Sequence, residues 1–400
     1  MPLIVQKFGG TSVGTPERIR LVADRIAQSY QSGNQLVVVV SAMGHTTDEL
    51  IDLAQKVSDQ PPHREMDMLL SAGERISMAL LSMALADRKV PAISLTGSQT
   101  GIITDQSHRR ARIQRILGGR VRTALAENNV VIVAGFQGVS ETKEITTLGR
   151  GGSDTTAVAL AAALNASLCE ILTDVDGVYS ADPRIVPHAK LWKTLPHDLM
   201  VELATRGAGV LHPRSIELAK QFKVPLQVKH SLKPGNEGTH VIDRNQVEKG
   251  QMEEFGIVGV TADSDKVHLT VSLSQSSAVS QVWERAARAH LSVVVPLFME
   301  NEVRFFSDRD GIRDWEKHLD EMKKSGLVKS YSIDSETVPL SVVGDRFSQD
   351  GLAFQRVLEV LSQAGISVST GSSSALAMTV GISRNRAKDG VEVLHRELVK

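Results

Sequence analysis

The sequence is poor in cysteine and in aromatic residues. It contains one cysteine, Cys169, and aromatic residues make up 4% of its 400 positions. A single cysteine excludes an intramolecular disulfide framework and a cysteine-based zinc site, which suits a reducing compartment. We therefore expect a cytoplasmic protein with no protein-bound metal centre.

An excess of charge of either sign is also missing. Lys and Arg number 45 against 46 Asp and Glu, so bulk charge would not hold a nucleic acid or an anionic membrane. Long hydrophobic runs are absent too, because the longest, such as residues 130–134, have the length of a strand. We expect no nucleic-acid partner, no membrane partner and no export signal.

The first 242 residues alternate short β-branched runs with helical stretches. The runs cover residues 36–40, 91–95, 130–134, 170–173 and 224–228. This alternation predicts an α/β fold with a mainly parallel sheet sandwiched by helices. A charged segment at 243–254 then breaks the pattern, so we predict a catalytic domain at 1–243 and a linker at 244–256.

Two units of similar layout follow the linker. Each reads as a strand, a helix, two strands and a helix, and the first helices carry apolar residues at i, i+3, i+4 and i+7. These residues are Val279, Val282, Trp283 and Ala286 in one unit and Phe354, Val357, Leu358 and Leu361 in the other. We predict two ferredoxin-like βαββαβ modules, at 257–336 and 337–400, with a regulatory role.

Several strands of the first domain end in polar clusters, where α/β sheets bind ligands. Lys7-Phe8-Gly9-Gly10 follows the first strand, and its glycines and lysine suit a phosphate, although an ordinary glycine turn explains them as well. Ser41 to Thr47 follow the second strand and could bind a carboxylate or cap the next helix. Glu74 and Arg75 lie within an apolar helix, so either Arg75 or another internal partner satisfies Glu74, or Glu74 binds a ligand ammonium.

Residues 146–154 form the most informative segment. The sequence TTLGRGGSD runs directly into an Ala-rich helix. A Gly-Gly loop at a helix N-terminus favours an anion, and Arg150 adds a forked donor that suits a carboxylate. Residues 172–184 contain little that could build a core, so Tyr179 and Arg184 could hold a nucleotide or the loop could be a solvated excursion.

Taken in order, KFGGTS, SAMGHTTD, SAGERIS, AGFQG, TTLGRGGSDTTA and TDVDGVYSADPR resemble the amino-acid kinase family, and within it the aspartate kinases with paired C-terminal ACT domains. The resemblance covers essentially the whole chain. It implies that Lys7 and Asp154 are catalytic. The implied ATP-binding residues are Lys7, Phe8, Gly9, Gly10, Ser41, Thr173, Asp174, Tyr179, Ser180, Asp182, Pro183, Arg184 and Gly209. The implied aspartate-binding residues are Thr47, Glu74, Arg150, Gly151, Gly152 and Ser153.

The resemblance also implies a reaction. ATP with Mg²⁺ would phosphorylate the β-carboxylate of L-aspartate to 4-phospho-L-aspartate, the first step towards lysine, threonine and methionine. That carboxylate is ionised at neutral pH, so the transfer needs no general base. Lysine, threonine or both would act as effectors at the ACT domains, through which the chain would form a homodimer or a larger oligomer.

One departure keeps alternatives open. Gly209 stands where family members commonly carry a lysine near the nucleotide. Two other interpretations therefore remain, a kinase for another acidic substrate such as glutamate or N-acetylglutamate, and an amino-acid sensor that has lost turnover. Glu74 and the paired modules argue against the first, and Lys7, Arg150 and Asp154 argue against the second.

Overall fold

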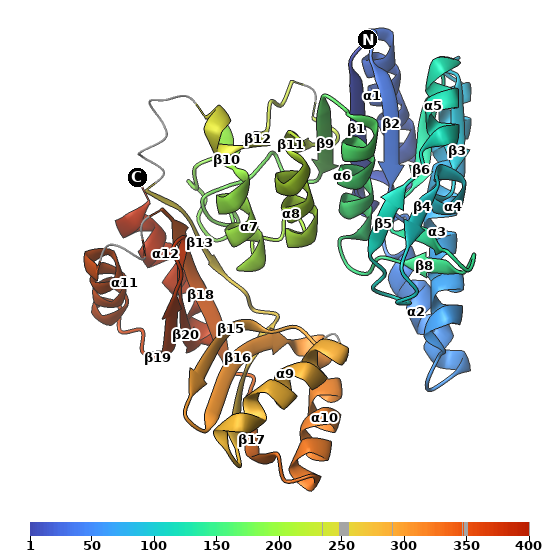
Figure 1. Ribbon diagram of the computed structural model, residues 1–400. Helices are drawn as coiled ribbons and strands as arrows, with labels where there is room; N and C mark the ends of the chain where they lie inside the picture. Colours follow the sequence, from blue (N-terminus) through green and yellow to red (C-terminus); the bar gives the residue numbers. More distant parts are fainter. Residues whose placement is uncertain (234, 248–255, 290, 346, 348–350, 400) are drawn as a thin grey trace. The chain divides into compact units, whose positions relative to one another are not determined.

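The structure, a computed structural model, describes residues 1–233, 235–247, 256–289, 291–345, 347 and 351–399 (Figure 1). It divides into two compact units. The first contains Met1–Val178, Leu191–Ala204 and Gly209–Met252, and the second contains Tyr179–Lys190, Thr205–Ala208 and Glu253–Lys400. Residues 248–255, most of the predicted linker, lie outside the described residues.

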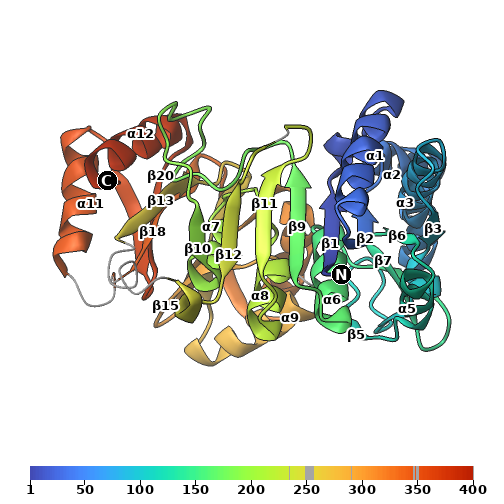
Figure 2. The same ribbon diagram turned by 90° about the horizontal axis from the view of Figure 1, so that it is seen from above.

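The first unit is built on an eight-stranded sheet with the order β10-β12-β11-β9-β1-β2-β6-β3 (Figure 2). The strands from β11 to β3 are mutually parallel, whereas β12 pairs antiparallel with β11. The strands are β1 (Leu3–Phe8), β2 (Gln35–Val40), β3 (Ala92–Leu95), β6 (Val130–Ala134), β9 (Leu168–Thr173), β10 (Thr194–Pro196), β11 (Leu226–His230) and β12 (Thr239–Ile242). The prediction of an α/β fold with a mainly parallel sheet is confirmed.

Helices pack on this sheet because successive residues of a strand face opposite sides. Leu36, Val38 and Val40 join one core with α1 (Pro16–Gln31) and α3 (His63–Ala86). Residues of the opposite parity, among them Val37 and Val39, are fully buried on the other face, where α6 (Gly152–Leu164) packs on β1, β2 and β9. The remaining helices of this unit are α2 (Thr46–Val57), α4 (Gly97–Thr100), α5 (Gly119–Ala126), α7 (His197–Thr205) and α8 (Pro213–Phe222).

A smaller sheet with the order β5-β4-β7-β8 completes the first unit. Its strands are β4 (Ile102–Thr104), β5 (Ile113–Ile116), β7 (Gln137–Ser140) and β8 (Ile145–Thr147). Strand β8 packs on α3 and leads directly into the loop that precedes α6. This sheet therefore sets the start of the Arg150 loop, which we define as residues 148–151.

Helix α3 is long and apolar enough to cross a membrane by length and composition alone. In the structure it is a core helix, since Leu70, Leu81 and Leu85 are buried. Its length thus serves to span the face of the sheet.

The second unit contains two four-stranded sheets. One has the order β15-β16-β14-β17, with strands β14 (Lys266–Leu273), β15 (Val294–Met299), β16 (Glu302–Asp308) and β17 (Val328–Asp334) and helices α9 (Val279–Arg288) and α10 (Ile312–Lys324). The helices bury Val282 and Trp315 against the sheet. The chain order β14-α9-β15-β16-α10-β17 is the βαββαβ layout that the sequence predicted.

The other sheet has the order β13-β18-β20-β19. Its elements are β13 (Ile257–Ala262), β18 (Thr337–Gly344), α11 (Gly351–Gln363), β19 (Val368–Ser373), β20 (Ala377–Ser383) and α12 (Ala387–Leu398). The predicted division at residue 337 placed β13 in the first module, but β13 pairs antiparallel with β18. The reason is that Val260 of β13 is buried in the core of the second module.

Residues 179–190 also belong to this second core. Ala181 and Val186 are buried there together with Leu340 and Leu394, and the Val260 amide donates to the Ser180 carbonyl oxygen over 2.8 Å. The expectation that residues 172–184 contain little that could build a core is therefore wrong at Ala181, which anchors this half of the segment together with Val186 just beyond it.

Candidate functional site

The carboxyl ends of β1, β2 and β9 meet at one edge of the large sheet, because Phe8 is level with Val40 and with Leu172. Backbone hydrogen bonds continue into the loops beyond. The Gly9 amide donates to the Leu172 oxygen over 3.2 Å, and the Gly44 amide donates to the Gly10 oxygen over 3.1 Å. The segments after the three strands are thus held side by side, as expected for a ligand crevice.

Gly10 is required by this close approach. A Cβ atom at Gly10 would stand 2.8 Å from the Ala42 carbonyl oxygen, so a larger residue would push the two loops apart. The side chain of Phe8 is fully buried in the core, and the Phe8 carbonyl oxygen accepts from the Ser41 amide over 3.1 Å. Phe8 therefore anchors the start of the Gly9-Gly10 loop in the core.

Lys7 and Asp154 form an ion pair beneath this edge. Lys7 Nζ lies 2.5 Å from Asp154 Oδ1, and the two side chains are only 12% and 11% exposed. Asp154 lies in the first turn of α6, on the face of the sheet towards which Lys7 points. The ammonium is also 3.7 Å from the position that a Cβ of Gly9 would take. Asp154 thus holds the Lys7 charge beside the glycine loop.

The N-terminus of α6 is shaped by glycine. Gly151 is the N-cap with a φ of 67°, a conformation that glycine adopts without strain. A Cβ there would stand 2.1 Å from Cγ of His212, so the ring of His212 packs directly on the backbone. The helix presents its positive end at this point. Arg150, next to it, is exposed, and Gly152 and Ser153 begin the helix.

Glu74 is buried in α3 with one oxygen left over. Its side chain accepts a hydrogen bond from the Ala42 amide at Oε1 over 3.1 Å, whereas Oε2 is buried with no hydrogen-bond partner among the described residues. Burial raises the pKa of the Glu74 carboxyl to about 7. Within the described residues no hydrogen bond or ion pair joins it to Arg75. The Ala42 amide is an internal partner for one oxygen, and the role of Glu74 as a ligand for an ammonium stays a prediction.

Two further predicted residues lie on the same edge. The carbonyl oxygen of Ser41 accepts from Ser77 Oγ over 2.7 Å, which fixes the turn after β2 to α3. Thr47 is half-buried in the first turn of α2. The N-cap of α2 is His45, and it makes no side-chain cap hydrogen bond, so this segment does not show the capping arrangement that the sequence left open.

The predicted nucleotide residues are divided between the two units. Thr173 ends β9 in the first unit and Asp174 follows it, and the Thr173 carbonyl oxygen accepts from the Ser231 amide over 2.7 Å. Gly209 is exposed in the same unit, with no atom within 4 Å of its Cβ position. The rest, Tyr179, Ser180, Asp182, Pro183 and Arg184, lie in the second unit.

Only some of the predicted nucleotide residues between 179 and 184 face solvent. Pro183 and Arg184 are exposed, and Arg184 pairs with Asp182 at 2.7 Å, which lowers the pKa of Asp182 through hydrogen bonding. Ser180 is buried, and its hydroxyl contacts His395. The nucleotide-binding role of these residues stays a prediction.

Sequence reasoning missed three residues around the Arg150 loop. His212 covers Gly151, Arg214 donates to the Leu148 oxygen over 3.0 Å, and Asp67 is a buried carboxylate that contacts Thr147. A polar residue inside an apolar helix was a usable signal for Asp67, whereas nothing local marks Arg214. Across the described part of the chain, no group of three or more His, Cys, Asp or Glu gathers as metal ligands would.

Comparison with known proteins identifies the family of the chain. A model of the amino acid kinase family matches residues 2–230. The aspartokinase of Geobacillus stearothermophilus is 44% identical over 404 residues, which cover 99% of this chain and 97% of that protein. Aspartokinase III of E. coli, solved with aspartate and ADP, covers all of both chains with a TM-score of 0.85 at 24% identity, and so supports the fold. The same enzyme with lysine and aspartate gives a TM-score of 0.75 at 25% identity over all of both chains. The chain therefore belongs to the amino acid kinase family and, within it, to the aspartokinases.

Proposed function

We propose that the chain transfers the γ-phosphoryl group of MgATP to the β-carboxylate of L-aspartate, with the reaction centred on the edge formed by β1, β2 and α6. A β-carboxylate oxygen forms the new bond to phosphorus, and ADP leaves as the γ-phosphorus–oxygen bond breaks. The observation that carries this proposal is the unpartnered oxygen of buried Glu74 near an ion-paired lysine and a helix N-terminus.

Glu74 supplies the site for the substrate ammonium. Its Oε2 is buried without a partner in the described structure, and an ammonium is the group that would satisfy it and favour its ionised form. The α-carboxylate of the substrate would then bind Arg150 and the start of α6, where Gly151, Gly152 and Ser153 lie at the positive end of the helix. Thr47 would contact the substrate from α2.

Lys7 supplies charge for the phosphates. Its ammonium lies beside the Gly9-Gly10 loop, 3.7 Å from the position that a Cβ of Gly9 would take, where backbone N–H groups can approach phosphate oxygens. Asp154 would keep that ammonium in place and orient it. Because the acceptor is already ionised, positioning and charge neutralisation are the whole task of the protein here, and Mg²⁺ enters on the nucleotide phosphates. Ser41, Thr173, Asp174, Gly209 and residues 179–184 would complete the nucleotide site.

One relative supports the proposed regulation by an amino-acid effector. The E. coli enzyme was solved with lysine, so we infer that lysine, threonine or both bind the two ACT-like modules of this chain. We further propose a cytoplasmic homo-oligomer that supplies 4-phospho-L-aspartate to the synthesis of lysine, threonine and methionine. We also propose a catalytic domain at 1–243 and regulatory modules beyond the linker.

The experiment that tests the function measures ADP release from MgATP with L-aspartate, L-glutamate and N-acetylglutamate in turn. Turnover with aspartate is expected, and silence with all three would favour a sensor. Replacing Arg150 with Ala should raise KM for aspartate about tenfold or more, because a charge-assisted hydrogen bond is lost, with KM for MgATP nearly unchanged.

A matched control is Arg115→Ala. Arg115 is exposed and pairs with Glu141 at 3.3 Å on the small sheet, and exposed pairs contribute little. Both KM values should stay as in the parent enzyme. An Arg150→Ala variant that keeps the parent KM for aspartate would refute the carboxylate-binding role.

A further inference from the structure

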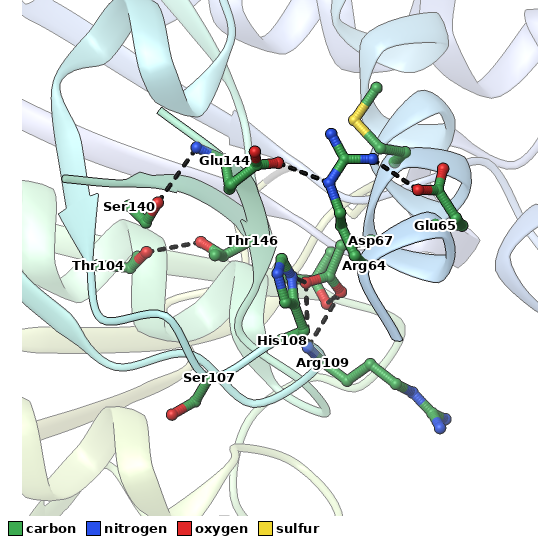
Figure 3. A network of polar contacts seen from close by, with 12 residues as sticks. Arg64, Glu65, Asp67, Thr104, Ser107, His108, Arg109, Ser140, Glu144 and Thr146 are labelled. Atoms are coloured by element: carbon green, nitrogen blue, oxygen red, sulfur yellow. Dashed lines mark hydrogen bonds and ion pairs between the residues drawn. The ribbon is translucent and has the colours of Figure 1, made fainter. Parts of the chain in front are cut away.

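Asp67 is a fully buried carboxylate that no part of the proposed chemistry uses. It lies on α3, and its side chain is 0% exposed. Oδ2 is 2.7 Å from His108 Nδ1, and the Arg109 amide donates to both oxygens over 3.0 and 3.1 Å (Figure 3). Thr147 Oγ1 donates to Oδ1 over 2.5 Å. One carboxylate therefore collects donors from two separate segments.

Both of these segments adjoin the Arg150 loop. Thr147 is the last residue of β8, immediately before Leu148. The segment that contains His108 and Arg109 packs on the loop itself, because a Cβ at Gly149 would stand 2.9 Å from the Arg109 carbonyl oxygen, and Gly149 has a φ of 77°. The Ala111 amide also donates to the Thr147 oxygen over 2.9 Å. Asp67 thus connects the two segments that pack against the Arg150 loop.

Arg214 ties the same two segments together from α8. Its Nη1 donates to the Leu148 oxygen over 3.0 Å and its Nη2 donates to the Ala111 oxygen over 2.9 Å. Two side chains therefore hold the segments that flank the Arg150 loop. One is the Asp67 carboxylate on α3 and the other is the Arg214 guanidinium on α8. These contacts would keep Arg150 in a fixed position, which matters because a binding side chain on a loop must be held precisely to orient a substrate.

We propose that Asp67 is a positioning residue for the substrate α-carboxylate and acts through the Arg150 loop. The inference rests on the proposed role of Arg150. If Asp67 cannot accept these hydrogen bonds, the buried donors lose their partner and the two segments separate to regain one. Arg150 is then displaced relative to Glu74, which stands two turns further along the same helix as Asp67. The distance between the ammonium site and the carboxylate site of the substrate is therefore set by α3.

A nearby ion pair provides a control. It distinguishes a role in positioning Arg150 from a role in merely joining α3 to the small sheet. Arg64, also on α3, pairs with Glu144 of the β7–β8 turn at 2.8 Å (Figure 3). It joins the same helix to the same small sheet as Asp67 does. The Arg64 side chain is exposed, however, and among the described residues its ion pairs are with Glu65 and Glu144, not with residues 107–111 or 147–151. Glu144→Gln is thus the matched control for Asp67→Asn.

The test is steady-state kinetics of the full chain with the variants Asp67→Asn, Glu144→Gln and Arg150→Ala and the double variant of Asp67 and Arg150. Asp67→Asn keeps the shape but exchanges an acceptor for a donor. It should raise KM for aspartate about tenfold and leave KM for MgATP within about twofold. Glu144→Gln should change neither value. In the Arg150→Ala background, Asp67→Asn should add no further rise.

The inference is overturned if Arg150→Ala raises KM for aspartate and Asp67→Asn does not, if both KM values rise equally, or if the two substitutions act additively. If Arg150→Ala itself has no effect, the proposed role of Arg150 fails first and the inference fails with it. Should Asp67→Asn give no folded protein, Thr147→Val removes one donor and keeps the volume. It should raise KM for aspartate about threefold, and an unchanged value would again overturn the inference.

Discussion

His395 Nε2 lies 2.8 Å from the hydroxyl oxygen of Ser180. The two residues are 215 positions apart in the chain and both are buried in the second unit. The same hydroxyl accepts a hydrogen bond from the Lys190 amide over 2.8 Å. Helix α12 of the C-terminal module therefore holds the segment on which Asp182, Pro183 and Arg184 stand.

This contact predicts a selective effect on the nucleotide. Replacing His395 with Ala should raise KM for MgATP about fivefold, which corresponds to a buried hydrogen bond of about 1 kcal/mol, and leave KM for aspartate within about twofold. His395→Gln, whose amide can still donate to Ser180, should restore much of the loss. The measurement is initial rates at varied MgATP.

The control for that experiment is Arg396→Ala on the same helix, because Arg396 is exposed and pairs with its neighbour Glu397. It should behave as the parent enzyme does. An unchanged KM for MgATP in His395→Ala would show that α12 does not position the segment.

Lys7 gives the sharpest prediction for turnover. Its ammonium, paired with Asp154 at 2.5 Å, is the cation beside the glycine loop. Lys7→Met should lower kcat by about 10² to 10³, the usual loss when a preorganised charge that stabilises a transition state is removed. Aspartate binding, measured by calorimetry, should persist. Lys317→Met is the control, because the Lys317 side chain on α10 is exposed. A kcat of Lys7→Met that falls less than tenfold would contradict the assignment.

Glu74 predicts how aspartate binding depends on pH. Burial raises the pKa of this carboxyl to about 7, so the free protein gains the carboxylate that pairs with an ammonium only as the pH rises through that value. The value of kcat/KM for aspartate should therefore rise between about pH 6 and pH 8. The Glu74→Gln variant should have a low value without this step. A parent profile that is flat near pH 7 would refute the role.

The same carboxyl has an effect on stability with a definite sign. Its pKa is about 7 in the folded state against a usual 4.5, so the folded protein binds the extra proton and stability falls as the pH rises from 4.5 to 7. Glu74→Gln should thus stabilise the free protein at pH 8, by at most about 3 kcal/mol, and change little at pH 4.5. Urea unfolding at the two pH values measures the difference.

The sequence predicted the parts of the site that are local in the chain. Lys7 and the Gly9-Gly10 turn lie at the end of a strand, and the Arg150 loop precedes a helix, so each carries its chemistry within a few residues. Asp67 is marked in the sequence only as a polar residue inside an apolar helix. Its partners His108 and Thr147 could not be predicted, because they are 41 and 80 residues distant. Residues 257–262 were assigned to the first module by position alone. The sequence does not show that they form β13, whose partner strand β18 lies beyond the whole first module.

The pairing of β13 with β18 also determines how the regulatory part can be divided. Ala262 is level with Leu340, so the chain leaves β13, builds the entire first module and returns to the adjacent strand. The first module is an insertion in the turn of a β-hairpin. Cutting the chain at residue 337 would separate the two arms of that hairpin and uncover buried Val342 along a bare strand edge, a template for aggregation. Excising the first module from β14 to β17, residues 266–334, would instead keep both arms of the hairpin, so gene fusions and fragment swaps should divide the chain there.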